Sequence, residues 1–299
     1  MAHRSWEHLR QNGARPFLGA NGTEAMAVLL EEGADHLVDY QKVGPFMGRE
    51  AVAALGARFP LLLHLDDTLS GHEPLPEATI ERLQGWVRLT GTPWTSEHIA
   101  YGVAEADLES APRPWPPSAG LSRETALANI VRNARALAEA LPVPLLLENI
   151  PLYPNVAHRH VCEPELVTEV LAQTGCGLLL DLAHARVTAS VLGVDVHAYL
   201  EALPLERVVE LHLSGPRSVG SLPPERRQRV WENARTVADE WTFSDDCLLD
   251  VHDTLQEEDY ALLAWVLARC QPQALSLEYY RDPGALREQL ERLGKMLGR

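Results

Sequence analysis

The sequence has few cysteines and none of the common cysteine motifs. The cysteines are widely spaced, and no CxxC pair is present. This spacing argues against a zinc finger and against a thioredoxin-like redox motif. We expect reduced, mostly buried thiols, the common state of cysteine in the cytoplasm. The four residues are Cys162, Cys176, Cys247 and Cys270.

Motifs of other common protein classes are also missing. The sequence has no GxGxxG or GxxxxGK loop, so nothing supports nucleotide binding. It has no Gly-x-Ser-x-Gly elbow, which argues against the usual serine hydrolases. Residues 1–15 are polar and lack an apolar signal core, and no run approaches the ~20 apolar residues of a membrane helix. We therefore expect a cytoplasmic protein with no membrane partner.

Positive charge is scarce in this chain. Lys and Arg number 26 against 42 Asp and Glu, which gives a formal net charge of −16. A protein that binds nucleic-acid phosphates needs a basic face, so this charge argues against a nucleic-acid partner. Cations held by several of the carboxylates would neutralise part of the excess.

Short apolar runs and helical segments alternate along the whole chain, and 46% of the residues are hydrophobic. Short apolar runs are typical of buried parallel strands, and their alternation with helices implies right-handed βαβ units. Eight such units can be counted, so we expect an α/β fold that closes as a (β/α)₈ TIM barrel. The expected strands are residues 16–20, 35–42, 59–64, 93–98, 143–148, 176–181, 207–212 and 274–278.

We expect one TIM-barrel domain over residues 1–299, with two insertions at its mouth. Residues 103–121, rich in Pro, Ala and Glu, predict a long loop over the site. Residues 215–246 form the second insertion and contain a helix over about 223–240. Long loops in a compact domain are usually functional. A ninth apolar run at 248–252 is assigned to the mouth and not to the barrel.

Side chains that can bind metals follow the apolar runs. His64, Glu148 and Asp181, for example, each end a run of three leucines. The carboxyl ends of parallel strands meet at one mouth, where such folds carry their active sites. We expect nine side chains to converge there as metal ligands: His64, His98, Glu148, Asp181, His184, His212, Asp250, His252 and Glu278.

The composition of this set favours a metal centre. A lone histidine after an apolar run is more often a buried neutral imidazole bonded to a backbone carbonyl. Five histidines and four carboxylates together would be a costly desolvated cluster without cations. Imidazole and carboxylate ligands suit iron, zinc or manganese. Glu97, next to His98, should point to the opposite face of its strand, which makes it at best a supporting residue.

Five segments of the chain carry a family resemblance. They are LLLENI (145–150), TGCGLLLDLAH (174–184), AYLEALPLERVVELHLSG (198–215), DVHD (250–253) and LEY (277–279). With Ser96-Glu97-His98, they resemble the multinuclear non-heme iron-dependent oxidases. That family includes the iron oxidase of methanobactin biosynthesis.

This resemblance implies a TIM barrel that holds two or three irons, with zinc or manganese as alternatives in the purified protein. It also implies that dioxygen is used to modify a peptide, typically at cysteine, that a partner protein presents. The family's ligands fall on His64, His98, Glu148, Asp181, His212, Asp250, His252 and Glu278.

The chain departs from the family pattern at three places. Ala183-His184 stands where the family has Asn-Asn, so His184 replaces an amide at a ligand position. A Glu-Asn pair near the second strand is replaced by Gln41-Lys42-Val43-Gly44. The insertion at 215–246 is longer than usual. These departures indicate a divergent branch, whose substrate is a peptide or a small molecule.

Three functions compete at this point. The leading hypothesis is a metal-dependent oxidase or oxygenase with a di- or tri-iron centre. The alternative is a divalent-metal-dependent sugar isomerase or endonuclease-IV-like hydrolase on a xylose-isomerase-like barrel, in which the ions polarise a hydroxyl or generate hydroxide. The net charge argues against a nuclease. A non-catalytic metal-binding or adaptor protein is the third hypothesis, and the many ligands present argue against it.

Overall fold

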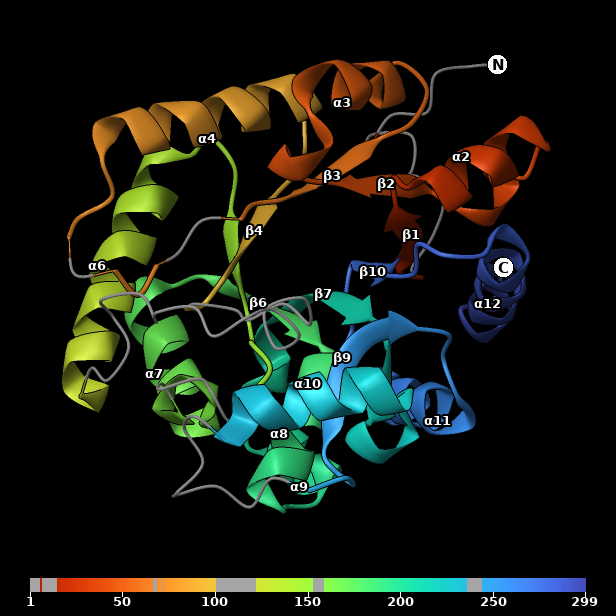
Figure 1. The fold of residues 1–299 in the computed structure, drawn as a ribbon. Helices are drawn as coiled ribbons and strands as arrows, with labels where there is room; N and C mark the ends of the chain where they lie inside the picture. Colours follow the sequence, from red (N-terminus) through yellow and green to blue (C-terminus); the bar gives the residue numbers. More distant parts are fainter. Residues whose placement is uncertain are drawn as a thin grey trace.

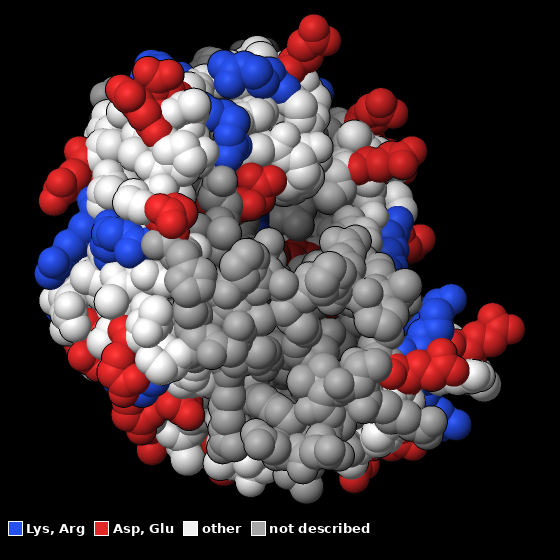
Figure 2. Space-filling view, turned by 60° about the vertical axis from the view of Figure 1, so that its left-hand side comes forward, with Lys and Arg blue, Asp and Glu red and all other residues white. Residues whose placement is uncertain are grey.

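The computed structural model describes Trp6 and residues 15–66, 69–71, 73–100, 122–152, 159–235 and 244–299. The loop predicted at 103–121 lies outside the described residues, as do residues 236–243 of the second predicted insertion. Within the described part of the chain, every helix is too short or too polar to cross a membrane. In Figure 2, several separate groups of Asp and Glu side chains are visible among the described residues, toward the edges of the face shown.

Eight parallel strands form a closed barrel with helices around it (Figure 1). The order is β1-β10-β7-β6-β5-β4-β3-β2, so the first and last strands pair and close the sheet. This confirms the (β/α)₈ TIM barrel expected from the sequence. The strands are β1 (Phe17–Asn21), β2 (Tyr40–Val43), β3 (Leu61–His64), β4 (Thr95–His98), β5 (Leu145–Glu148), β6 (Gly177–Asp181), β7 (Val208–Leu213) and β10 (Ala274–Leu277).

The second strand is shorter than predicted. Residues Asp35–Leu37 form a 3-10 turn instead of extended chain, and β2 begins only at Tyr40. The carboxylate of Asp39 explains the late start. It accepts a hydrogen bond from Leu18 N (2.9 Å) and pairs with Arg15 (3.1 Å), which ties this turn to β1 before the strand begins.

Helices follow most of the strands, and α6 begins after a capping serine, where Ser122 Oγ accepts a hydrogen bond from Thr125 N (3.2 Å). Helix α8 is buried on nearly all sides, and polar and apolar residues alternate over 184–190, so its sequence shows little helical periodicity. The helices are α2 (Glu24–Glu31), α3 (Arg49–Gly56), α4 (Glu77–Thr90), α6 (Arg123–Ala140), α7 (Pro164–Thr174), α8 (Leu182–Leu192), α9 (Val196–Glu201), α10 (Pro224–Arg235), α11 (Glu257–Leu267) and α12 (Pro283–Met296).

An aromatic layer closes the barrel at the end where its strands begin. The Trp6 ring lies 5.4 Å from Tyr40 and 5.8 Å from Trp94 between ring centroids, and its Nε1 donates to Leu61 O (3.1 Å). Leu62, Leu146 and Leu179 are buried with these rings. Among the described residues, polar side chains line the barrel interior mainly at the opposite end, where the strands finish.

The apolar run at 248–252 lies outside the barrel, as expected. It belongs to β9 (Leu248–Asp253), which pairs antiparallel with β8 (Gly215–Ser218). The backbone of this pair approaches so closely that a Cβ added at Gly215 would lie 2.2 Å from Thr254 O. After β8 the chain continues into α10, which confirms a helix in the second insertion.

Candidate metal centre

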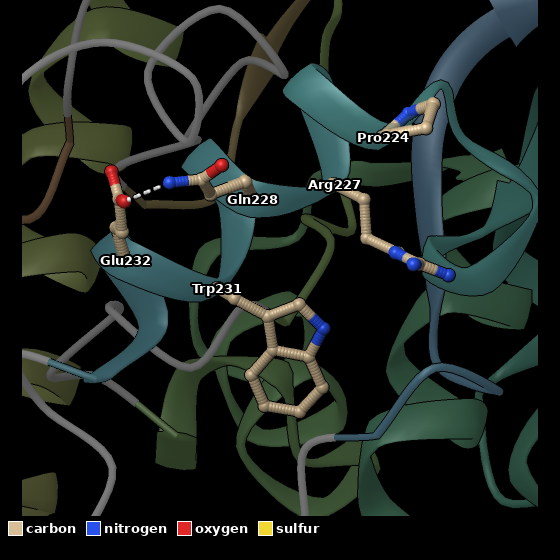
Figure 3. A pocket seen from close by; sticks show the side chains of 5 residues that line it. All are labelled: Pro224, Arg227, Gln228, Trp231 and Glu232. Carbon is tan, nitrogen blue, oxygen red and sulfur yellow. Dashed lines mark hydrogen bonds between the residues drawn. The ribbon is translucent and has the colours of Figure 1, made fainter.

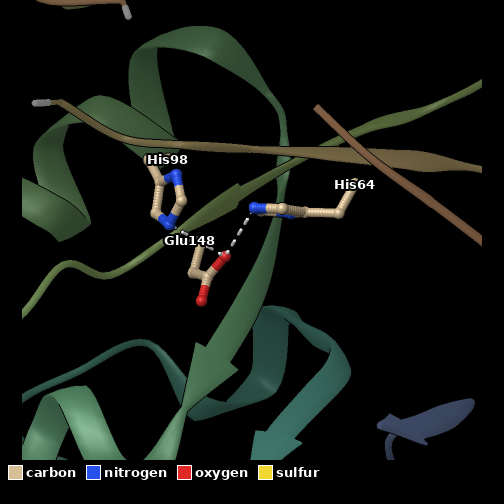
Figure 4. Close-up of side chains that lie close together, drawn as sticks. All are labelled: His64, His98 and Glu148. Atoms are coloured by element: carbon tan, nitrogen blue, oxygen red, sulfur yellow. Dashed lines mark ion pairs between the residues drawn. The ribbon is translucent and has the colours of Figure 1, made fainter. Parts of the chain in front are cut away.

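Glu148, the last residue of β5, lies at the middle of a cluster of histidines. Its Oε2 is 3.5 Å from His64 Nε2 and 3.6 Å from His98 Nε2 (Figure 4). Its Oε1 is 3.5 Å from His184 Nδ1 and 3.3 Å from His212 Nδ1. One buried carboxylate therefore contacts histidines that follow four different strands.

The remaining predicted ligands continue the same cluster. Asp250 Oδ2 lies 3.3 Å from His184 Nε2 and 3.5 Å from His252 Nε2. His252 Nε2 in turn lies 3.3 Å from Glu278 Oε2. Asp181 Oδ2 is 3.9 Å from His184 Nε2. The structure thus brings all nine side chains together at the carboxyl ends of the strands, and their role as metal ligands stays a prediction.

Three sets of possible ligand atoms can be distinguished in this cluster. Within each set, one atom from every residue lies within 4.8 Å of the others. Neighbouring sets share a carboxylate, and a carboxylate can bridge two ions with its two oxygens. We call these sets the first group (His64, His98 and Glu148), the second group (Glu148, Asp181 and His184) and the third group (Asp181, His212 and Glu278).

Two buried oxygens of these groups have no conventional partner. Glu148 and Asp181 are 1% and 0% exposed. Glu148 Oε2 and Asp181 Oδ2 accept no hydrogen bond from the described residues. Leaving a buried carboxylate oxygen unsatisfied is costly, and a cation is the ligand that best offsets the cost. The donor set therefore fits a bound metal ion.

The first group is already in the protonation state that a metal needs. Burial lowers the pKa of both His64 and His98, and Lys42 lowers that of His64 further. Burial also raises the pKa of Glu148, but the nearby His212, His98 and His64 outweigh it and hold that pKa well below the usual range. Neutral imidazoles and an ionised carboxylate are metal ligands without further proton loss.

The second group holds a proton in the metal-free protein. Burial raises the pKa of Asp181 to about 7. Burial lowers the pKa of His184, but Asp181 and Asp250 outweigh it and raise that pKa well above the usual range. A metal ion that binds His184 must therefore displace a proton.

His184 lies in the first turn of α8 and not in a loop after Asp181. Asp181 caps this helix, and its Oδ1 accepts a hydrogen bond from His184 N (2.7 Å). His184 Nδ1 is 2.7 Å from Asn149 O, which can accept its proton. A backbone carbonyl that accepts from one ring nitrogen orients the other toward a metal, here Nε2 beside Asp250.

We predict that His184→Asn weakens the binding of iron and zinc and flattens its pH dependence. In the wild type, occupancy at limiting metal should fall as the pH is lowered, because the raised pKa of His184 lets protons compete with the metal for its ring nitrogen. The Asn side chain carries no such proton. Equilibrium dialysis followed by elemental analysis measures both effects, and His197→Asn on the surface of α9 is the matched control. Unchanged metals, number and pH dependence would show that His184 is not a ligand.

Two further residues reach the cluster and were not predicted as site residues. Lys42, on β2, donates a hydrogen bond to Glu278 Oε1 and lies 3.3 Å from His212 Nδ1. Glu210 lies two residues before His212 on the same face of β7, and its Oε1 is 3.1 Å from His212 Nε2. Trp94 Nε1 donates to Glu210 Oε2 (2.9 Å), which holds this carboxylate in place.

The charges around His212 make it a strong base. Burial and Lys42 lower its pKa, but Glu278 and Glu148 outweigh them and raise it to about 10.

Glu97 is also buried, and its Oε1 accepts a hydrogen bond from His98 N (2.9 Å). Glu97 therefore supports the backbone of His98, in agreement with its predicted supporting place.

A cavity of about 630 Å³ lies beside α10, in the second insertion. Figure 3 shows the side chains of Arg227, Gln228 and Trp231 along it. Gln228 Nε2 donates to Glu232 Oε1 (2.8 Å), and Trp231 Nε1 donates to Asp245 Oδ1 (2.8 Å). None of the described residues that line it is a predicted metal ligand.

Similar solved structures share the barrel. Endonuclease IV from Thermus thermophilus aligns with a TM-score of 0.52 and 19% identity, over 94% of this chain and 98% of that one. A xylose isomerase-like TIM barrel protein from Mycobacterium smegmatis, in complex with magnesium, aligns with a TM-score of 0.52 and 11% identity, over 95% of this chain and 96% of that one. At these identities the likeness shows the fold alone.

Relatives in sequence are bacterial UPF0276 proteins. One from Caulobacter vibrioides is 28% identical over 230 residues, which are 73% of this chain and 80% of that protein. Another, from Bordetella pertussis, is 29% identical over 273 residues, which are 89% of this chain and 85% of that protein.

The family described as RiPP precursor modification enzyme MbnB/TglH/ChrH matches residues 39–296. This range contains all nine predicted ligands, and it confirms the resemblance to the multinuclear non-heme iron-dependent oxidases. The chain therefore belongs to this family of modification enzymes, as a divergent member.

Proposed function

We propose that this chain is a non-heme iron-dependent oxidase or oxygenase that modifies a peptide or small-molecule substrate at the carboxyl-end mouth of its barrel. The observation that carries the proposal is the position of Glu148. Its Oε2 faces the ring nitrogens of His64 and His98, and Glu148 also belongs to the second group with Asp181 and His184. A carboxylate between two nitrogen donor sets suits a bridged pair of metal ions.

The first and second groups are the residues that would hold these ions. Bound iron would supply the redox chemistry with dioxygen that histidine and carboxylate ligands tune. The protein fixes the ligands before any ion binds. His64 Nδ1 shares a hydrogen bond with Ser96 Oγ (2.9 Å), and Asp250 Oδ1 accepts one from Ser214 Oγ (2.6 Å).

The insertion at the mouth supports a substrate of peptide or small-molecule size. The cavity beside α10 falls within the ~300–1,000 Å³ range of ligand pockets. Arg227 and Trp231 offer it a positive charge and an aromatic surface. Asp250 and His252 lie on β9, just after this insertion in the chain, so the proposed substrate would extend from α10 toward the edge of the metal cluster. A partner protein that presents the substrate is part of this proposal.

Metal analysis combined with spectra tests the proposed chemistry. The protein is produced without added metal, purified under nitrogen and analysed for iron, zinc and manganese. We expect iron in more than one equivalent per chain and an absorption spectrum that changes when air is admitted. Zinc, manganese or magnesium with a spectrum indifferent to air would favour an isomerase or hydrolase instead. Protein without bound metal, even after reconstitution, would contradict both.

A further inference from the structure

Lysine is rare in this chain, and one of its two lysines lies in the metal cluster. Of the 26 basic residues, 26 − 2 = 24 are arginine, and the two lysines are Lys42 and Lys295. Lys295 is exposed on α12. Lys42 is 6% exposed, and it projects from β2 into the mouth of the barrel. A buried lysine needs a specific partner, because desolvating its charge is costly.

The partners of Lys42 are ligand atoms of the third group. Its Nζ pairs with Glu278 Oε1 and lies 3.3 Å from His212 Nδ1. These two atoms are 3.6 Å apart, the spacing of two donors that share one cation. The ammonium therefore lies where an ion of the third group would bind.

An ammonium and a metal ion exclude each other at this point. A lysine ammonium has three donors and no lone pair, so it cannot ligate a metal while it is charged. A divalent cation bound by His212 and Glu278 would lie against a like charge in a buried site, where repulsion is strong. The first group, by contrast, offers a metal ion the ligand atoms Glu148 Oε2, His64 Nε2 on β3 and His98 Nε2 on β4.

We propose that the Lys42 ammonium takes the place of a third metal ion, so that this chain loads two ions and not three. Glu278 holds the ammonium beside His212, while the first and second groups hold the two ions through the shared Glu148. Trp94 Nε1 donates a hydrogen bond to Glu210, and Glu210 contacts His212 Nε2. These contacts hold the His212 ring in the orientation that places its Nδ1 beside Lys42. This inference rests on the proposed metal centre.

Counting metals in lysine variants tests the proposal. Each protein is loaded with excess zinc, desalted and analysed for zinc per chain. We expect two equivalents in the wild type, three in Lys42→Met, and two in Lys42→Arg, which keeps the charge. Lys295→Met is the matched control and should also bind two. A Lys42→Met protein that binds only two would overturn the proposal, as would a wild type that binds three.

A second measurement uses the wild type alone and does not depend on the folding of a variant. Because the chain has two lysines, ¹⁵N-lysine labelling gives two side-chain amine signals. We expect the Lys42 signal to remain that of a buried, slowly exchanging ammonium at every zinc ratio. Its displacement at a third equivalent would overturn the proposal. A wild type that binds no metal would instead contradict the proposed function itself.

Discussion

Glu148→Gln should abolish metal loading. Glutamine keeps the shape of glutamate but removes the charge and one of the two acceptor oxygens, so neither the first nor the second group stays complete. Partners outside the ligand set already cost ~10–100-fold in metal affinity when they are lost, and this shared ligand should cost more. Elemental analysis after dialysis against a weak chelator measures the result.

Glu165→Gln provides the matched control, because Glu165 is exposed on α7 and takes no part in the cluster. This variant should retain the metal content of the wild type. If Glu148→Gln also retained it, with only a slower turnover, Glu148 would not be a ligand and the shared-carboxylate arrangement would be wrong.

Removing the metals should lower the melting temperature of the protein by about 8 °C for each ion lost. A ligand that binds only the folded state at a thousand times its Kd adds ~4 kcal/mol to the free energy of unfolding. For a chain of this size, each kcal/mol moves the midpoint by roughly 2 °C. The buried carboxylates Glu148 and Asp181 lose the cation that offsets their burial. Calorimetry with and without EDTA measures the shift.

Two controls accompany the melting experiment. Returning zinc or ferrous iron to the stripped protein should restore the higher midpoint, and Glu148→Gln should melt at the same temperature with and without EDTA. A wild-type midpoint that stays constant while elemental analysis shows the metals leaving would mean that the cluster is stable without cations.

The barrel and most of the cluster could be predicted because the sequence marks the strand ends. Leucine runs that stop at His64, Glu148 and Asp181 indicate buried strands and the point at which each reaches polar surroundings. Since parallel strands end at one mouth, spacing along the chain translates into proximity in space. The same reasoning correctly kept the run at 248–252 out of the barrel.

The residues missed lack that signal. Lys42 follows Gln41 on a strand with no leucine run, so the pattern does not mark where β2 ends. Glu210 stands inside an apolar run, and only the two-residue repeat of a strand places it below His212. The helix after Asp181 is buried on nearly all sides and alternates polar and apolar residues over 184–190, so the aspartate cap is the main sign of the start of α8.

Because β1 pairs with β10, the barrel cannot close until the last strand has been synthesised. The bond between Lys42 and Glu278 joins residues 236 positions apart, and the barrel closes only when the last strand has left the ribosome. Contacts of such long range form late in folding. The histidines of β3 and β4 are made long before Asp250 on β9 and Glu278 after β10. Mature metal loading therefore follows completion of the chain, and a C-terminally truncated product would present a partial, open set of ligands.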